Sequence, residues 1–130
     1  MHIAGSVVLR NMKDSDYFVR AAPGLRAPVD VPLRDGEVIV GWFVNPPPFA
    51  EFFVVFTDVA LIAGTKEAHR RIDYANILSL AYPGKTGETW KLELATVGGS
   101  EVIVIGGAIR EGSTALNSYC LAAALRRLMA

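Results

Sequence analysis

The chain has 130 residues, of which 52% are hydrophobic and 20% are charged, and its 13 basic and 13 acidic side chains leave no formal net charge. This length suits one domain that folds without a metal or disulfide, and the single cysteine excludes an internal disulfide. The neutral charge argues against a general nucleic-acid binder, whereas the high apolar content predicts a surface prone to association.

The first quarter of the chain differs in composition from the rest. Residues 1–34 contain three prolines and little regular hydrophobic spacing, so we expect an irregular N-terminal arm. Within it, Ile3–Leu9 is the best candidate for a strand. Residues 14–16 are typical caps for a short helix over Tyr17–Ala22, which Pro23 would end. The N-terminal residues lack a signal-peptide pattern and no apolar stretch is long enough to span a membrane, so we expect a soluble, cytoplasmic protein.

The pattern of residues 35–130 predicts a second region, made mainly of strands and ending in a helix. Short β-branched and aromatic runs alternate there with clusters of Gly, Pro, Asn and Asp. One of these runs is long enough to bend in its middle, and Gly98, Gly99 and Ser100 are typical of a hairpin turn. The predicted strands are Glu37–Val44, Phe52–Thr57, Ala60–Gly64, Arg71–Tyr82, Trp90–Val97 and Glu101–Ile105.

The last segment changes to a helical period. Ser113 or Thr114 is a suitable N-cap, and no Gly or Pro follows before Met129. Half of the helical wheel is apolar, so this helix is expected to cover a hydrophobic opening. The apolar half contains Leu116, Cys120, Leu121, Ala124, Leu125 and Leu128, and the other half contains Ser118, Ala122 and Arg126.

Four segments resemble the bacterial branch of the pleckstrin homology-like superfamily, which is related to GRAM domains. Gly36–Val40 resembles the opening strand, and Phe53–Ile62 resembles the second strand, its Thr-Asp turn and the returning strand. Arg71–Leu80 is similar to the family's Ile-Pro-Tyr segment, with Asp73 where proline is common, and Leu121–Leu128 is similar to the capping helix. The resemblance implies an antiparallel β-barrel or sandwich capped by one amphipathic helix.

The sequence predicts no catalytic, metal or cofactor site. Cys120 lies on the apolar half of the predicted helix, where its thiol would be inert, and His2 and His69 have no carboxylate or thiol partner at a useful spacing. The glycine-rich segments lack the spacing of a phosphate-binding loop. A ligand-binding barrel or a small enzyme is the least favoured hypothesis, with candidate polar residues Tyr74, Asn76, Tyr82 and Trp90.

The resemblance also suggests a test for phosphoinositide binding. The loop that would hold the headgroup, Asn45–Glu51, carries no cation and one carboxylate, so the inherited site is expected to be missing. A second basic cluster, made of Lys66, His69, Arg70 and Arg71, is a candidate contact for an anionic lipid or phosphate, although a solvated loop is the simpler interpretation.

Several predicted strands are apolar on both faces. In a small barrel, one face of each strand is exposed to solvent. The apolar side chains on that outer face therefore need a second cover, either the N-terminal arm or another chain. We favour another copy of this chain, and we predict a non-catalytic interaction or scaffolding module that self-associates. The alternative is a peripheral membrane or lipid-binding module. The candidate interaction surface consists of Trp42, Phe43, Phe49, Phe53 and Val55.

Overall fold

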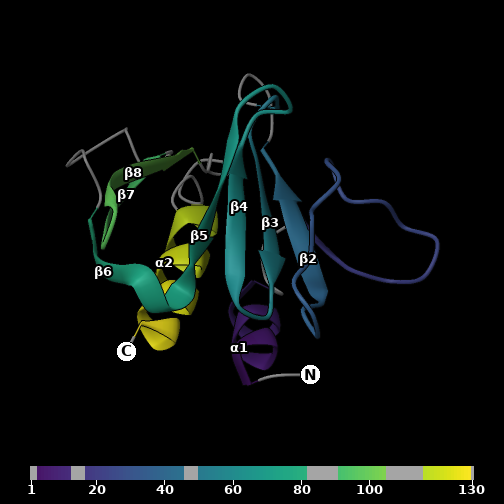
Figure 1. Cartoon of the computed structure of the whole chain (residues 1–130), viewed down its shortest axis with the longest axis horizontal. Coiled ribbons are helices and arrows are strands. Elements are labelled where there is room, and N and C mark those ends of the chain that lie inside the picture. The colour runs from purple at the N-terminus through teal and green to yellow at the C-terminus, as the bar shows by residue number, and fades with distance from the viewer. Residues whose placement is uncertain (1–2, 13–16, 46–49, 82–90, 105–115, 130) are drawn as a thin grey trace.

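A computed structural model of the chain describes residues 3–12, 17–45, 50–81, 91–104 and 116–129. In this part of the chain, two antiparallel sheets and two helices enclose one main core (Figure 1). The fold is therefore mainly β with a C-terminal helix, as the sequence predicts. The two sheets do not close into one continuous sheet, so the arrangement is that of a sandwich.

The first sheet has five strands in the described residues, and their order in the sheet is their order in the chain. All neighbours are antiparallel. The predicted strand over 60–64 is confirmed at both ends, and those over 37–44 and 52–57 are confirmed with slightly later starts. The strands are β1 (Phe18–Arg20), β2 (Ile39–Val44), β3 (Phe53–Thr57), β4 (Ala60–Gly64) and β5 (His69–Asp73).

The long predicted strand over 71–82 bends, and the bend carries the chain from one sheet to the other. After β5, a single 3-10 turn, η1 (Tyr74–Asn76), leads into β6 (Ile77–Ala81). Tyr74 anchors this corner because its amide donates to the carbonyl of Val59 and its buried hydroxyl donates to the carbonyl of Thr57 at 2.8 Å. The side chain thus ties the corner to the turn between β3 and β4.

The second sheet is a three-stranded meander. It contains β6, β7 (Lys91–Thr96) and β8 (Gly99–Val104), joined in that order. Leu92 and Leu94 of β7 are buried while Glu93 between them is exposed, which is the alternation of a sheet with one wet face. The inner face of this sheet closes the core opposite the first sheet.

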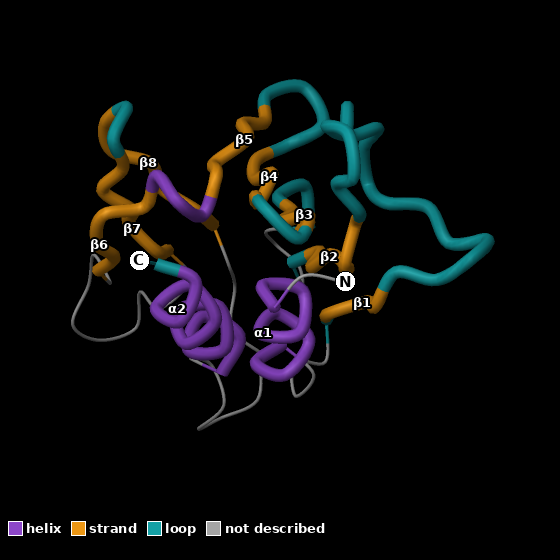
Figure 2. Tube along the Cα trace, turned by 60° about the horizontal axis from the view of Figure 1, so that its bottom comes forward, coloured by secondary structure: helices purple, strands orange, loops and turns teal. Residues whose placement is uncertain are grey.

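The two helices pack against each other beside the sheets. They are α1 (Ile3–Met12) and α2 (Leu116–Leu128), and Figure 2 shows them side by side. Val8 and Met12 of α1, and Leu121 and Leu125 of α2, are fully buried in the same core as the sheet residues Phe43, Phe56, Leu61, Leu92, Leu94 and Ile103.

Two predictions in the N-terminal segment are wrong. Ile3–Leu9, expected to be a strand, lies in helix α1, because Val8 and Met12 are four residues apart and meet α2 on one face. Residues 17–22, expected to be a helix, contain strand β1 instead, since Phe18–Arg20 pair with β2. Consequently, within the described ranges, two helices rather than one pack beside the sheets.

The helix at the C-terminus follows its predicted pattern with one exception. Leu121, Ala124 and Leu125 are buried and Arg126 is exposed, as predicted. Ala122, assigned to the polar half of the helix, is fully buried. The contact of α2 with α1 gives this helix a second buried face. The predicted caps at 113 and 114 lie outside the described residues.

Strand β1 approaches β2 closely because residue 41 is glycine. A Cβ atom at Gly41 would lie 2.5 Å from Cζ of Phe18 and 2.6 Å from the carbonyl oxygen of Val19. The second of these atoms belongs to the backbone and cannot move without shifting the strand. Gly41 is therefore required for the pairing of β1 with β2.

Substitution Gly41→Ala is expected to reduce the free energy of unfolding by about 1–3 kcal/mol, because the added methyl forces β1 away from β2. Urea denaturation followed by circular dichroism measures this loss. Gly98→Ala is the control, since only Thr96 Oγ1, at 4.0 Å, lies near the added carbon. Equal denaturation midpoints for the two variants would contradict the argument.

Candidate functional site

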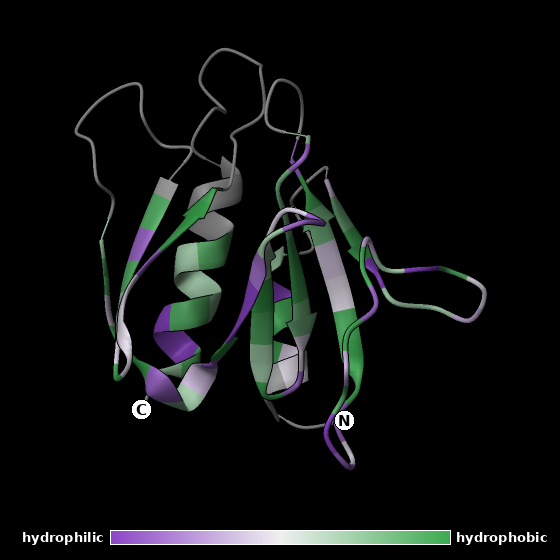
Figure 3. Cartoon of the chain, turned by 45° about the horizontal axis from the view of Figure 1, so that its top comes forward, coloured by the Kyte–Doolittle hydropathy of each residue, from purple (hydrophilic) through white to green (hydrophobic). Residues whose placement is uncertain are grey.

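The outer face of the first sheet is apolar, and the chain itself covers it. Figure 3 shows hydrophobic residues along most of the length of the central strands. On the outer face they form a second, smaller cluster of buried side chains, Trp42, Phe53, Val55 and Ile62. Apolar side chains of residues 21–31, here called the covering segment, pack against it: Ala21, Ala27, Val29 and Val31.

This cover accounts for the predicted interaction surface. Trp42, Phe43, Phe53 and Val55 are at most 7% exposed. Phe43 belongs to the main core, and the other three lie beneath the covering segment. The prediction that these four residues form an exposed interaction surface is therefore wrong: they lie in the interior, because the N-terminal arm supplies the second cover. Phe49 lies outside the described residues.

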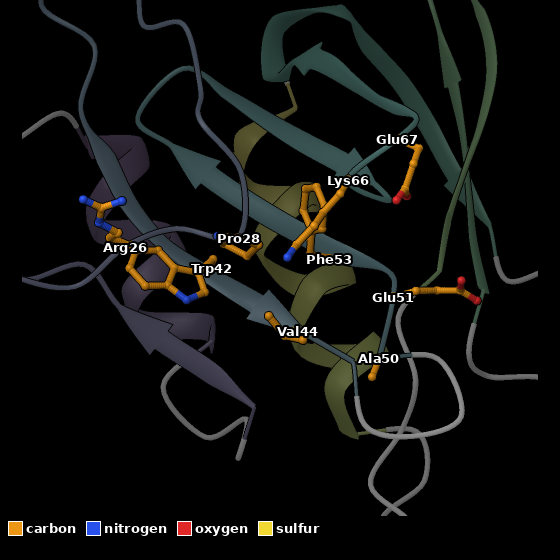
Figure 4. Close-up of a pocket in the computed structure, with 9 residues that line it drawn as sticks. All are labelled: Arg26, Pro28, Trp42, Val44, Ala50, Glu51, Phe53, Lys66 and Glu67. Carbon is orange, nitrogen blue, oxygen red and sulfur yellow. The ribbon is translucent and has the colours of Figure 1, made fainter.

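The cover is incomplete at one end and leaves a pocket, here called the Trp42 pocket. Its volume is about 560 Å³, which is in the range of ordinary ligand sites. The walls come from the covering segment, from β2, from β3 and the residues just before it, and from the turn between β4 and β5. Figure 4 shows the nine lining residues: Arg26, Pro28, Trp42, Val44, Ala50, Glu51, Phe53, Lys66 and Glu67.

The rim of the Trp42 pocket carries two cations and two carboxylates. Arg26, Lys66, Glu51 and Glu67 are all exposed, and none forms an ion pair within the described part of the chain. In Figure 4, Arg26 lies on the Trp42 side, the two glutamates lie on the opposite side, and Lys66 lies between them. The pocket therefore combines an apolar floor with a rim whose charge changes sign from one side to the other.

The covering segment is fixed at its C-terminal end by a buried ion pair. Arg71 of β5 donates two hydrogen bonds to the carboxylate of Glu37, at 2.7 and 2.8 Å, and one to the carbonyl of Pro32 at 3.1 Å. Glu37 also accepts from the Thr57 hydroxyl and from the amide of Arg34. This arrangement, the Glu37 cluster, joins the end of the arm to β3 and β5.

The contacts of Glu37 change its acidity. Its side chain is only 1% exposed, and burial by itself raises a carboxyl pKa. The hydrogen bonds from Arg71 outweigh this burial, and together with those from Thr57 and Arg34 they lower the pKa of Glu37 to about 2. The same pair raises the pKa of Arg71. Both groups are therefore charged near neutral pH, and neither is a free contact for a ligand.

The four residues predicted to contact an anion do not form one patch. Arg70 and Arg71 are consecutive in β5 and bind different carboxylates, since Arg70 pairs with Glu101 of β8 at 2.7 Å. The ring of His69 lies against Phe53, with centroids 5.9 Å apart, and its Nδ1 is 3.0 Å from the carbonyl of Thr65. Only Lys66 lines the Trp42 pocket.

The other candidates from the sequence do not assemble a polar site in the described residues. Tyr74 is buried, which raises the pKa of its phenol, and its hydroxyl is used in the corner described above. Asn76 is exposed. Tyr82, Trp90, His2 and the side chain of Cys120 lie outside the described residues. No group of three or more metal-ligating side chains occurs within the described ranges.

Sequence reasoning missed the role of Glu37, and it named the N-terminal arm as a possible cover while favouring a second copy of the chain. Glu37 was assigned to a strand, and nothing local to it marks a partner 34 residues away. The covering segment did carry a signal in the sequence, because apolar residues stand at every second position, Ala27, Val29 and Val31. That spacing is typical of an extended segment with one buried side.

Comparison of the chain with protein-family models, with curated proteins and with solved structures finds no match. In the described part of the chain, neither helix is long and apolar enough to cross a membrane.

The Glu37 cluster predicts a specific dependence of stability on pH. Because the folded-state pKa lies below the ordinary value of 4.5, the cluster stabilises the fold above pH 4.5, and this contribution is lost as the pH falls toward 2. Glu37→Gln is expected to lower the free energy of unfolding by about 3 kcal/mol at pH 7. The difference from the unaltered protein should shrink as the pH falls from 4.5 toward 2.

Urea denaturation at a series of pH values measures this effect. The matched control is Glu93→Gln, which changes an exposed carboxylate of β7 and should cost less than about 0.5 kcal/mol at any pH. If the loss in free energy of unfolding caused by Glu37→Gln stays constant down to pH 2, the carboxylate charge is not the cause of that loss.

Proposed function

We propose that this chain is a non-catalytic protein-interaction module that binds a short extended segment of a partner protein in the Trp42 pocket. The observation that carries the proposal is a pocket of about 560 Å³ over an indole and a phenyl ring. Trp42 and Phe53 are at most 7% exposed, so they form a rigid, preformed floor of limited exposed area. Such a pocket can hold apolar side chains of a bound segment while its rim contacts the adjacent backbone and charges.

The rim favours a peptide over an anionic membrane. Glu51 and Glu67 lie at the same pocket as Arg26 and Lys66, so a uniformly anionic surface would meet repulsion as well as attraction. Arg70 and Arg71, expected to serve a lipid, are paired with Glu101 and Glu37. A polypeptide can present both signs of charge and apolar side chains within a few residues.

The chemistry of the lining supports binding without catalysis. No serine, cysteine, histidine or threonine is among the nine lining residues, so within the described part of the chain the pocket offers no hydroxyl, thiol or imidazole group for nucleophilic catalysis. Its two carboxylates are exposed at the rim. Without a buried group poised for proton transfer, these residues serve recognition.

The order of the elements supports a pleckstrin homology-like architecture as part of this proposal. The meander β2 to β5 is followed by the meander β6 to β8 and then by α2. This is the order that the sequence resemblance implies for residues 35–129. Strand β1 and helix α1 are additions to that order.

Self-association was predicted from the two-sided apolar strands. Because the covering segment lies over β2 and β3, that surface no longer requires a second chain. Self-association therefore remains a separate prediction, and light scattering after size-exclusion chromatography tests it. A mass of 14.0 kDa at every concentration would contradict it.

Filling the pocket tests the proposed function. We expect a displayed random library to yield peptides that bind the folded protein. These peptides should bind the variant Ala50→Trp at least tenfold more weakly than the unaltered protein, because the new indole occupies the pocket. Ala75→Trp, on the exposed side of η1 and away from the pocket, is the control and should retain affinity. Fluorescence polarisation of labelled peptides measures both.

Two outcomes would contradict the proposal. One is a selection that yields no peptide, although circular dichroism shows the protein to be folded. The other is equal affinity for Ala50→Trp and the unaltered chain, which would place peptide binding elsewhere on the molecule.

A further inference from the structure

The Trp42 pocket differs in its lining from the other hollows of the described surface. A hollow of about 620 Å³ beside it shares Arg26, but its lining has no aromatic side chain and only one carboxylate, Asp30. Two hollows, of about 240 and 420 Å³, lie where β5 and β8 face each other. Arginines line both, but each of these is already paired with a carboxylate: Arg34 with Asp73, Arg70 with Glu101 and Arg71 with Glu37. A ligand there would have to break existing ion pairs.

At the Trp42 pocket, by contrast, all four charged groups lack an ion-pair partner in the described residues. Lys66 and Glu67 are adjacent in the turn between β4 and β5, yet the Lys66 nitrogen does not come within 4.0 Å of any carboxylate oxygen of the described residues. Arg26 likewise forms no ion pair with a described carboxylate. These groups remain available to charges on a ligand, and binding one would cost no internal ion pair.

The charges are also separated by sign. Arg26 lies at the Trp42 side of the pocket, and Glu51 and Glu67 lie at the other side, with Lys66 between the two sides (Figure 4). A ligand lying across the floor would place opposite ends of itself in regions of opposite charge. A uniformly acidic or uniformly basic ligand would be attracted at one end of the pocket and repelled at the other.

We infer that the Trp42 pocket selects a dipolar segment, in which apolar residues are flanked by an acidic side chain at one end and a basic side chain at the other. The apolar residues enter the pocket that Trp42, Val44 and Phe53 line. The acidic side chain faces Arg26 and Lys66, and the basic side chain faces Glu51 and Glu67. This inference rests on the proposed function, because it specifies the class of segment that the pocket takes.

Synthetic peptides test the inference directly. The dipolar probes have the cores Asp-Phe-Val-Lys and Lys-Phe-Val-Asp, acetylated and amidated so that only the side chains are charged. The comparison peptides are Asn-Phe-Val-Gln, Asp-Phe-Val-Asp and Lys-Phe-Val-Lys. One dipolar order is expected to bind at least fivefold more tightly than all three comparison peptides, and this advantage should shrink as salt is raised.

Charge reversal identifies the residues responsible. In the double variant Arg26→Glu with Lys66→Glu, the rim becomes acidic throughout, so the dipolar peptide should lose at least tenfold in affinity and Lys-Phe-Val-Lys should become the preferred ligand. The control is Arg20→Glu, which reverses an exposed cation of β1 that does not line the pocket. The control should keep the original order of affinities.

The possible failures are distinguishable. If the neutral peptide binds as tightly as both dipolar peptides, the charge inference is wrong and the proposed function stands. If no peptide binds but vesicles of phosphatidylcholine and phosphatidylserine do, and the double variant abolishes that binding, both the inference and the proposed function are overturned in favour of a membrane site.

Discussion

The buried ion pair between Glu37 and Arg71 is the interaction on which the arrangement of the first sheet depends. It joins the end of the N-terminal segment to β5, and through Thr57 it also reaches β3. A carboxylate this deeply buried would be unfavourable alone, but it accepts hydrogen bonds from a guanidinium, a hydroxyl and a backbone amide. The pair thus holds the segment that covers the outer face of the sheet.

The cover has a functional consequence because it is partial. Residues 21–31 pack small apolar side chains against the outer cluster of the sheet but leave a pocket at one end, which Trp42, Val44 and Phe53 help to line. A fully covered sheet would offer no site, and an uncovered one would expose a broad apolar surface prone to nonspecific association. The pocket that remains is of limited size and has a charged rim, which suits selective recognition of a short segment.

Much of the fold could be predicted because strand and helix periodicity are local properties. The alternating and β-branched runs indicated β2, β3, β4, β7 and β8, and the long run over 71–82 indicated a bend where η1 lies. The N-terminal elements were misassigned since their side chains are compatible with either state. Contact of Val8 and Met12 with α2, and of Phe18 with the position of Gly41, decided between helix and strand.

The candidate site could be predicted only in part. The sequence by itself determined that β2 and β3 are apolar on both faces and therefore need a second cover. Which chain supplies that cover was decided only by tertiary structure, because it depends on Glu37 meeting Arg71 across 34 residues and on the covering segment returning over Trp42. Local patterning specifies how many faces must be buried, whereas long-range contacts specify what buries them.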